Sequence, residues 1–176
     1  MRWLAIAVLL MSGFPFSSDL PPRVGTYSGY FHTLQRAIPP QLGCRNKDSL
    51  SRADFEAVMK IVSDARQEGD ARRAAECFTQ DAVYSSPPVP AHVGRDKLFE
   101  LFGGLKGSTM SAKIEWHHLV FDPEQQLGAA EFTQQYHLQT HGTVIVKFSH
   151  GLISNWREYD VPSDLSWQKF VGINAF

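Results

Sequence analysis

The order of the hydrophobic patterns along the chain restricts its fold more than any other feature. Apolar residues recur at helical spacing between Phe55 and Ala65, whereas the chain from Ala112 onward consists of strand-like segments bounded by turn residues. His150 and Gly151 are a tight-turn signal between the last two strands. Helices first and consecutive antiparallel strands afterwards are typical of an α+β domain. The expected strands are Ala112–Phe121, Leu127–Gln139, Thr143–Ser149 and Leu152–Tyr159.

The first helix carries its own start and stop signals. Ser51 is a favoured N-cap residue, and Asp54 stands three positions later, where it completes a capping box. Gly69 is placed where a helix-ending glycine belongs. The remaining expected elements are a helix from Asp70 to Phe78, a brief strand Ala82–Tyr84, a helix from Gly94 to Phe102 and a helical turn within Ser163–Phe170.

The first residues have the pattern of a secretory signal peptide. Arg2 precedes an apolar run that is far shorter than the roughly 20 residues needed to cross a bilayer. We therefore predict a signal peptide over residues 1–18, no stable membrane span, and a secreted or periplasmic protein. The alternatives are a retained anchor and a wrongly assigned start codon. Residues 19–50, which are rich in proline and glycine, are expected to form a loosely structured lead-in to a domain over 51–176.

Charge and motifs exclude several classes of protein. The chain has 17 basic and 18 acidic residues, a formal net charge of -1, and no block of lysine or arginine. A nucleic-acid surface requires a basic stripe, so no nucleic-acid partner is expected. The glycine-rich motifs that bind nucleotides are missing from the sequence, and no cysteine or histidine spacing suits zinc. We therefore expect neither a cofactor nor a metal.

The two cysteines leave two states open. In an exported protein, a disulfide between Cys44 and Cys77 would join the lead-in to the second helix. The alternative is two unpaired thiols buried in the core, where free cysteine is often found. The sequence alone does not decide between these states.

Three phrases occur in an order that resembles the SnoaL-like, nuclear transport factor 2-like superfamily. They lie within Gly69–Tyr84, Val93–Leu98 and Gly151–Asp160, and the resemblance covers about residues 51–170. It implies a cone-shaped α+β fold with three N-terminal helices packed on a curved antiparallel sheet. It also implies a pocket for a small, largely apolar organic molecule. Because the superfamily includes isomerases, dehydratases, epoxide hydrolases, polyketide cyclases and proteins with no known activity, the fold does not specify the chemistry.

Glu158 is the candidate acid or base that the resemblance provides. In the similar limonene epoxide hydrolases, an acid within a Trp-Arg-acid-Tyr phrase faces the pocket, and Glu158 occupies that place here. Strand alternation puts Glu158 on the same face as Trp156. A partly desolvated carboxyl group has a raised pKa and can transfer protons. The structural alternative is that Glu158 pairs with a nearby basic residue and stabilises the sheet.

The rest of the known catalytic machinery is incomplete. The similar hydrolases also use an arginine and an aspartate from an earlier strand, and the matching stretch Phe132–His137 contains neither. Within it, Gln135 can hydrogen-bond a ligand or orient a water molecule. Ketosteroid isomerases place an aspartate immediately before a proline after the first strand, where this chain has Ser86 before Pro87. Neither mechanism is therefore expected in its known form.

A third mechanism would use histidine. His137 is expected to share a polar face with Gln135, and only one of His117 and His118 can point the same way, beside Tyr84. Scytalone dehydratase, on a similar fold, combines histidines with tyrosines for the elimination of water. A histidine that titrates near neutral pH is a suitable proton shuttle. The alternative is that these histidines are satisfied interior or interface groups.

Two functions therefore follow from the sequence. The first is a cofactor-free lyase, isomerase or hydrolase for a small organic molecule, with Glu158 and His137 as the proton-transfer groups. The second is a non-catalytic ligand-binding or dimerising domain of the same fold. By resemblance, a homodimer is expected through the outer face of the sheet. The expected ligand-binding residues are Gln135, Tyr84, His118, Trp156 and Trp116.

Overall fold

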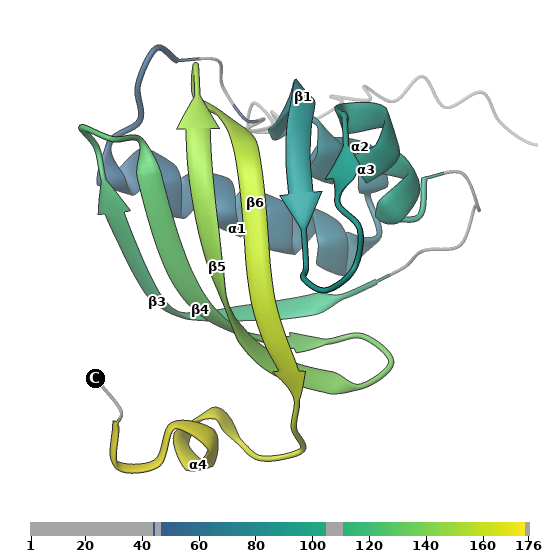
Figure 1. Cartoon of the computed structure of the whole chain (residues 1–176), viewed down its shortest axis with the longest axis vertical. Coiled ribbons are helices and arrows are strands. Elements are labelled where there is room, and N and C mark those ends of the chain that lie inside the picture. Colours follow the sequence, from purple (N-terminus) through teal and green to yellow (C-terminus); the bar gives the residue numbers. More distant parts are fainter. Residues whose placement is uncertain (1–43, 45–46, 105–110, 175–176) are drawn as a thin grey trace, which may run out of the picture. The chain divides into compact units, whose positions relative to one another are not determined.

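The computed structural model describes residue 44 and residues 47–104 and 111–174 (Figure 1). The predicted signal peptide and most of the predicted lead-in lie outside these residues, so export stays a prediction. All of the described residues belong to one compact unit. Its elements are α1 (Arg52–Glu68), α2 (Ala71–Ala75), β1 (Phe78–Ser85), β2 (His92–Val93), α3 (Arg95–Leu101), β3 (Lys113–Asp122), β4 (Leu127–Gln135), β5 (Gln139–Ser149), β6 (Leu152–Pro162), α4 (Trp167–Val171) and a 3-10 turn (Gly172–Asn174).

The strands form one curved, six-stranded sheet in the order β2-β1-β6-β5-β4-β3 (Figure 1). Strands β3 to β6 pair antiparallel as expected, and so do β1 and β2. Strand β1 runs parallel to β6, so the prediction of an antiparallel sheet is wrong at this pair. A tight hairpin forces two consecutive strands to run antiparallel, but β1 and β6 are joined through most of the domain and are free of that constraint.

Helix α1 begins and ends as its sequence signals predict. The Ser51 hydroxyl accepts the Asp54 amide while the Asp54 carboxylate accepts the Ser51 amide, which completes the capping box. Gly69 ends the helix in the left-handed conformation, with φ 73°. The buried face of α1 packs on the sheet, where the Phe55 ring stacks on Phe121 with centroids 4.9 Å apart. Gly128 of β4 permits this approach, because a Cβ atom there would lie 2.6 Å from the Phe55 ring.

Several predicted boundaries differ from the structure, most of all at the end of the second helix and around the loop between β4 and β5. Helix α2 ends at Ala75 rather than at Phe78, because Phe78 starts β1 and pairs with Ile153 of β6. The predicted strand to Gln139 stops at Gln135, and residues 136–138 form a hairpin loop before β5 begins. No glycine, proline or asparagine marks that loop in the sequence, so the first strand is predicted too long and the next, predicted from Thr143, begins earlier, at Gln139. The turn at His150 and Gly151 is confirmed, and both residues have positive φ.

The two cysteines form a disulfide in the structure. Their Cα atoms lie 5.0 Å apart, and the bond closes a loop with a sequence separation of 33 residues. Cys77 is completely buried between α2 and β1, next to the core residue Phe78. The bond therefore attaches residue 44, within the predicted lead-in, to the centre of the domain.

Candidate functional site

Strand register divides the predicted site residues between the two faces of the sheet. Residues paired across antiparallel strands share a face. We call the side packed against α1 the inner face and the opposite side the outer face. Trp116 pairs with Phe132 on the inner face, and the Trp116 indole donates a hydrogen bond to the Met59 carbonyl of α1. Thr133 pairs with His141 on the outer face.

Glu158 lies on the inner face between two hydrogen-bond donors. Tyr84 donates its hydroxyl proton to Oε1 of Glu158 at 2.7 Å, and the Trp156 indole donates to Oε2 at 2.9 Å. The two aromatic rings stack with centroids 5.8 Å apart and planes at 6°. Both donors are buried, whereas Glu158 remains partly exposed. One carboxyl group is therefore held rigidly by two aromatic side chains from neighbouring strands.

Burial controls the protonation of this cluster. Desolvation raises the pKa of Glu158 above its ordinary value, although the hydrogen bonds from Trp156 and Tyr84 and the nearby charge of Arg66 act in the opposite direction. Desolvation and the adjacent Glu158 carboxylate also raise the pKa of Tyr84 well above its ordinary value. Tyr84 therefore stays a hydrogen-bond donor at neutral pH. Glu158 is the group that can exchange a proton under mild conditions.

Charged side chains at one end of the inner face complete the cluster. Arg66, from the last turn of α1, holds its guanidinium over the Phe102 ring, 5.3 Å from the centroid. Its charge favours the ionised form of Glu158, whereas the charge of Asp160 opposes it. Asp160 follows Glu158 at the next inward position of β6, as strand alternation predicts. Sequence reasoning missed Arg66, whose place in the helix gives no indication that it faces the sheet.

Four predicted site residues meet on the inner face. Glu158, Tyr84 and Trp156 are in direct contact, and the Trp116 ring lies edge-on to Trp156 with centroids 6.2 Å apart. Their meeting follows from the register, since Tyr84 pairs with Trp156 across β1 and β6. Three strands and helix α1 thus contribute to one aromatic and acidic surface.

The other three predicted site residues lie elsewhere. His137 sits exposed in the loop between β4 and β5, where its ring contacts only that of Tyr136 among the described rings. The expectation that it shares a strand face with Gln135 is wrong, because β4 ends at Gln135. Gln135 and His118 lie on the outer face, where Gln135 pairs with Gln139 and His118 contacts Glu131 at 2.8 Å. The structure does not bring any of the three to Glu158.

A β-bulge corrects the expectation for His117 and His118. Between the pairs Trp116–Phe132 and Leu119–Ala130, two residues of β3 stand opposite the single residue Glu131. His117 contacts the Thr133 hydroxyl at 2.7 Å, and His118 contacts Glu131, so both histidines are on the outer face. Strict alternation predicts that only one of them points that way. The extra residue in the bulge lets both histidine side chains point to the outer face.

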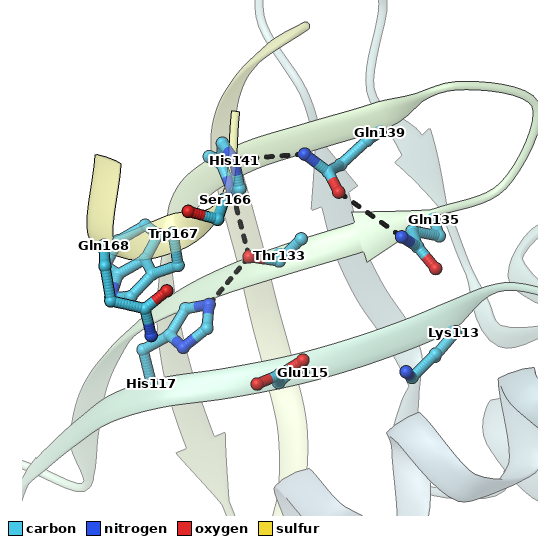
Figure 2. A pocket seen from close by; sticks show the side chains of 10 residues that line it. All are labelled: Lys113, Glu115, His117, Thr133, Gln135, Gln139, His141, Ser166, Trp167 and Gln168. Atoms are coloured by element: carbon cyan, nitrogen blue, oxygen red, sulfur yellow. Dashed lines mark hydrogen bonds between the residues drawn. The ribbon is translucent and has the colours of Figure 1, made fainter. Parts of the chain in front are cut away.

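On the outer face, the C-terminal segment closes a hollow of about 220 Å³ (Figure 2). We call it the outer hollow. The Trp167 ring of α4 stacks on His117 with centroids 4.1 Å apart, and Phe170 packs against His141 at 4.5 Å. His141 is almost completely buried beneath this segment. Sequence reasoning missed His141 and Trp167 as site residues. The hollow is lined by Lys113, Glu115, His117, Thr133, Gln135, Gln139, His141, Ser166, Trp167 and Gln168.

The hydrogen bonds behind the hollow fix its proton positions. Nε2 of His141 lies 2.9 Å from the Leu165 carbonyl, which can only accept, so this nitrogen carries the proton. In a neutral His141 ring, Nδ1 then accepts from the Thr133 hydroxyl at 2.9 Å. The Thr133 oxygen in turn accepts from Nε2 of His117. The neutral His117 ring therefore keeps the lone pair on Nδ1, and desolvation lowers the pKa of His117 and favours that form.

The described residues contain neither a cluster of metal-ligating side chains nor a membrane-spanning helix. Among residues 44, 47–104 and 111–174, no three or more histidine, cysteine, aspartate or glutamate side chains are grouped as metal ligands. Within the same part of the chain, every helix is too short or too polar to cross a bilayer.

Solved structures share this fold. A protein of unknown function with a cystatin-like fold from Methylobium petroleophilum PM1 has a TM-score of 0.57 and 24% identity, covering 68% of this chain and 83% of that one. An NTF-2-like protein from Burkholderia xenovorans LB400 has a TM-score of 0.56 and 16% identity, with coverage of 70% and 97%. An LEH-like epoxide hydrolase from M. tuberculosis has a TM-score of 0.54 and 17% identity, with coverage of 62% and 84%.

These likenesses show an α+β fold of the nuclear transport factor 2-like class. Residues 50–156 match the SnoaL-like domain, and the chain therefore belongs to the SnoaL-like family. The match ends at Trp156, so Glu158 lies just beyond it. The family match therefore does not depend on Glu158.

Proposed function

We propose that the inner face binds a small, largely apolar organic molecule and that Glu158 exchanges a proton with it. The observation that carries this proposal is the partly exposed Glu158 carboxyl, whose pKa burial raises, held between the Tyr84 hydroxyl and the Trp156 indole. A carboxyl group with a raised pKa is protonated over a wider pH range and can serve as an acid or a base. The reaction class is lyase, isomerase or hydrolase chemistry without a cofactor.

The neighbours of Glu158 suit this role. The Tyr84 hydroxyl can stabilise negative charge on the carboxylate or on the ligand, because its own pKa stays high. The Trp116 ring provides a flat apolar surface that is partly exposed beside the buried Trp156. The charge of Arg66 favours the ionised form of Glu158, whereas the charge of Asp160 favours its protonated form. An epoxide hydrolase among the structures of similar fold supports proton-transfer chemistry on such a sheet.

The second candidate function is a non-catalytic ligand-binding or dimerising domain. The observation in its favour is the tight aromatic packing around Glu158, where Phe78, Tyr84 and Trp156 are each at most 6% exposed. The separation of His137 and Gln135 from Glu158 also removes the other predicted proton-transfer group and a predicted ligand-binding residue. In this case Glu158 would serve to orient Tyr84 and Trp156.

Glu158→Gln distinguishes the two functions. Wild-type protein and the variant are incubated with a mixture of small organic metabolites, and mass spectrometry follows the consumption of each compound. The first function predicts that at least one compound is converted by the wild type and by Glu124→Gln, an exposed control, but not by Glu158→Gln. Thermal unfolding checks that the variants fold. A compound that is retained but converted by neither protein supports the second function, and equal conversion by both excludes Glu158 as the proton-transfer group.

A further inference from the structure

The outer hollow presents an ordered set of charges along β3. Lys113, Glu115 and His117 are alternate residues and line the same hollow, so they succeed one another at about 7 Å along the strand. The order is a cation, an anion and a neutral base. In the part of the chain that the structure describes, neither Lys113 nor Glu115 forms an ion pair, whereas six other pairs are formed. The positive charge of Lys113 and the negative charge of Glu115 are thus available to a ligand in the outer hollow.

The neutral base of this set is directed by the network behind it. His117 donates through Nε2 to Thr133, so its Nδ1 atom can accept a hydrogen bond. The stacked Trp167 ring and the Thr133 hydroxyl, which also contacts His141, keep the His117 ring in place. The Nδ1 acceptor of His117 is therefore held by side chains of β3, β4 and α4. Such a fixed position is what a binding site needs.

Amide groups and the C-terminal segment complete the cavity. Gln135 uses Nε2 to contact Gln139 at 3.3 Å, which leaves its carbonyl oxygen as an acceptor, while Ser166 and Gln168 approach from the other side (Figure 2). A space of about 220 Å³ corresponds to about seven water molecules at ~30 Å³ each, so a ligand with few atoms fits. The hollow is polar over most of its wall, unlike the aromatic inner face.

We propose that the outer hollow is a second binding site, for a small zwitterion that carries an amino and a carboxylate group on neighbouring atoms, such as an α-amino acid. The carboxylate pairs with Lys113. The ammonium group donates to Glu115 and to Nδ1 of His117, both acceptors. This site is independent of the proton transfer proposed at Glu158, because the sheet separates the two faces.

Isothermal titration with L-alanine tests this proposal, with propionate and ethylamine as probes that carry one charge each. The wild type is expected to bind L-alanine at least about tenfold more tightly than either single-charge probe, since a hydrogen bond between charged groups is lost in each. Lys113→Gln and Glu115→Gln are each expected to weaken L-alanine binding by about tenfold. Lys147→Gln and Glu124→Gln are matched controls outside the hollow and should bind as the wild type does.

The proposal fails under either of two results. One is that the wild type shows no binding of L-alanine at millimolar concentrations, while its thermal unfolding shows that it is folded. The other is binding that Lys113→Gln and Glu115→Gln leave unchanged, or that propionate or ethylamine reproduces in full. Because both substitutions are of exposed side chains, loss of the fold is not expected to obscure the result.

Discussion

Replacement of Trp156 by alanine is expected to lower the free energy of unfolding by about 3–5 kcal/mol. Trp156 is 2% exposed, and its ring contacts those of Phe78, Tyr84 and Trp116. The substitution leaves a large cavity in the core and removes the indole donor from the Glu158 carboxyl. Both effects reduce stability, and urea denaturation followed by circular dichroism measures their sum.

Two further variants separate these effects. Trp156→Phe keeps much of the aromatic ring but removes the indole donor. It should therefore lower the free energy of unfolding clearly less than Trp156→Ala does. Trp167→Ala is the matched control on the outer face, where the side chain is only partly buried, and it should cost far less than Trp156→Ala. Equal losses for Trp156→Ala and Trp167→Ala would contradict the assignment of Trp156 to the centre of the core.

Removal of the disulfide is expected to lower the free energy of unfolding by about 3–4 kcal/mol. A cross-link with a sequence separation of 33 residues restricts the unfolded chain by roughly this amount in the loop-entropy description. Cys44→Ser is the suitable variant, because Cys44 is only partly buried whereas Cys77 is completely buried. In Cys77→Ser, a serine hydroxyl would be buried, and its desolvation would lower the stability for a reason unrelated to the cross-link.

Thermal unfolding with and without a reductant provides the control. Reductant should lower the melting temperature of the wild type to near that of Cys44→Ser, and it should leave the melting temperature of the variant unchanged. If the oxidised wild type and Cys44→Ser melt together, the cross-link does not stabilise this domain.

Local signals in the sequence predict much of the fold. The cap of α1 at Ser51, its end at Gly69 and the turn at His150 each depend on chemistry within a few residues, and the structure confirms them. Strand alternation likewise places Trp156 and Glu158 together on one face. Hence the acidic and aromatic part of the candidate site follows from local pattern and resemblance.

The remaining features depend on contacts between distant segments. The parallel pairing of β1 with β6 has no local signal, because it is selected by packing of the whole domain. Strict alternation cannot predict the bulge at His117 and His118, which brings both histidines to the outer face of the sheet. Arg66 and Trp167 enter the two sites from helices, so only the tertiary structure shows what they contact.

The pH dependence of stability follows from the raised pKa of Glu158. The folded protein holds this proton more tightly than the unfolded chain, whose carboxyl titrates near the ordinary value of 4.5. Between that pH and the higher pKa of the folded state, the folded protein therefore binds more protons, and its stability falls as the pH rises. Glu158→Gln should remove this fall and leave the rest of the pH profile unchanged.

We propose that burial in the inner face keeps Glu158 able to transfer a proton. The most direct measurement is a pH titration of the glutamate side-chain carboxyl carbons by NMR, with Glu158→Gln used to assign the signal. We predict a midpoint for Glu158 above 4.5, and a further change of that midpoint when Tyr84→Phe removes one donor. A midpoint at or below 4.5 would contradict the proposed proton-transfer role.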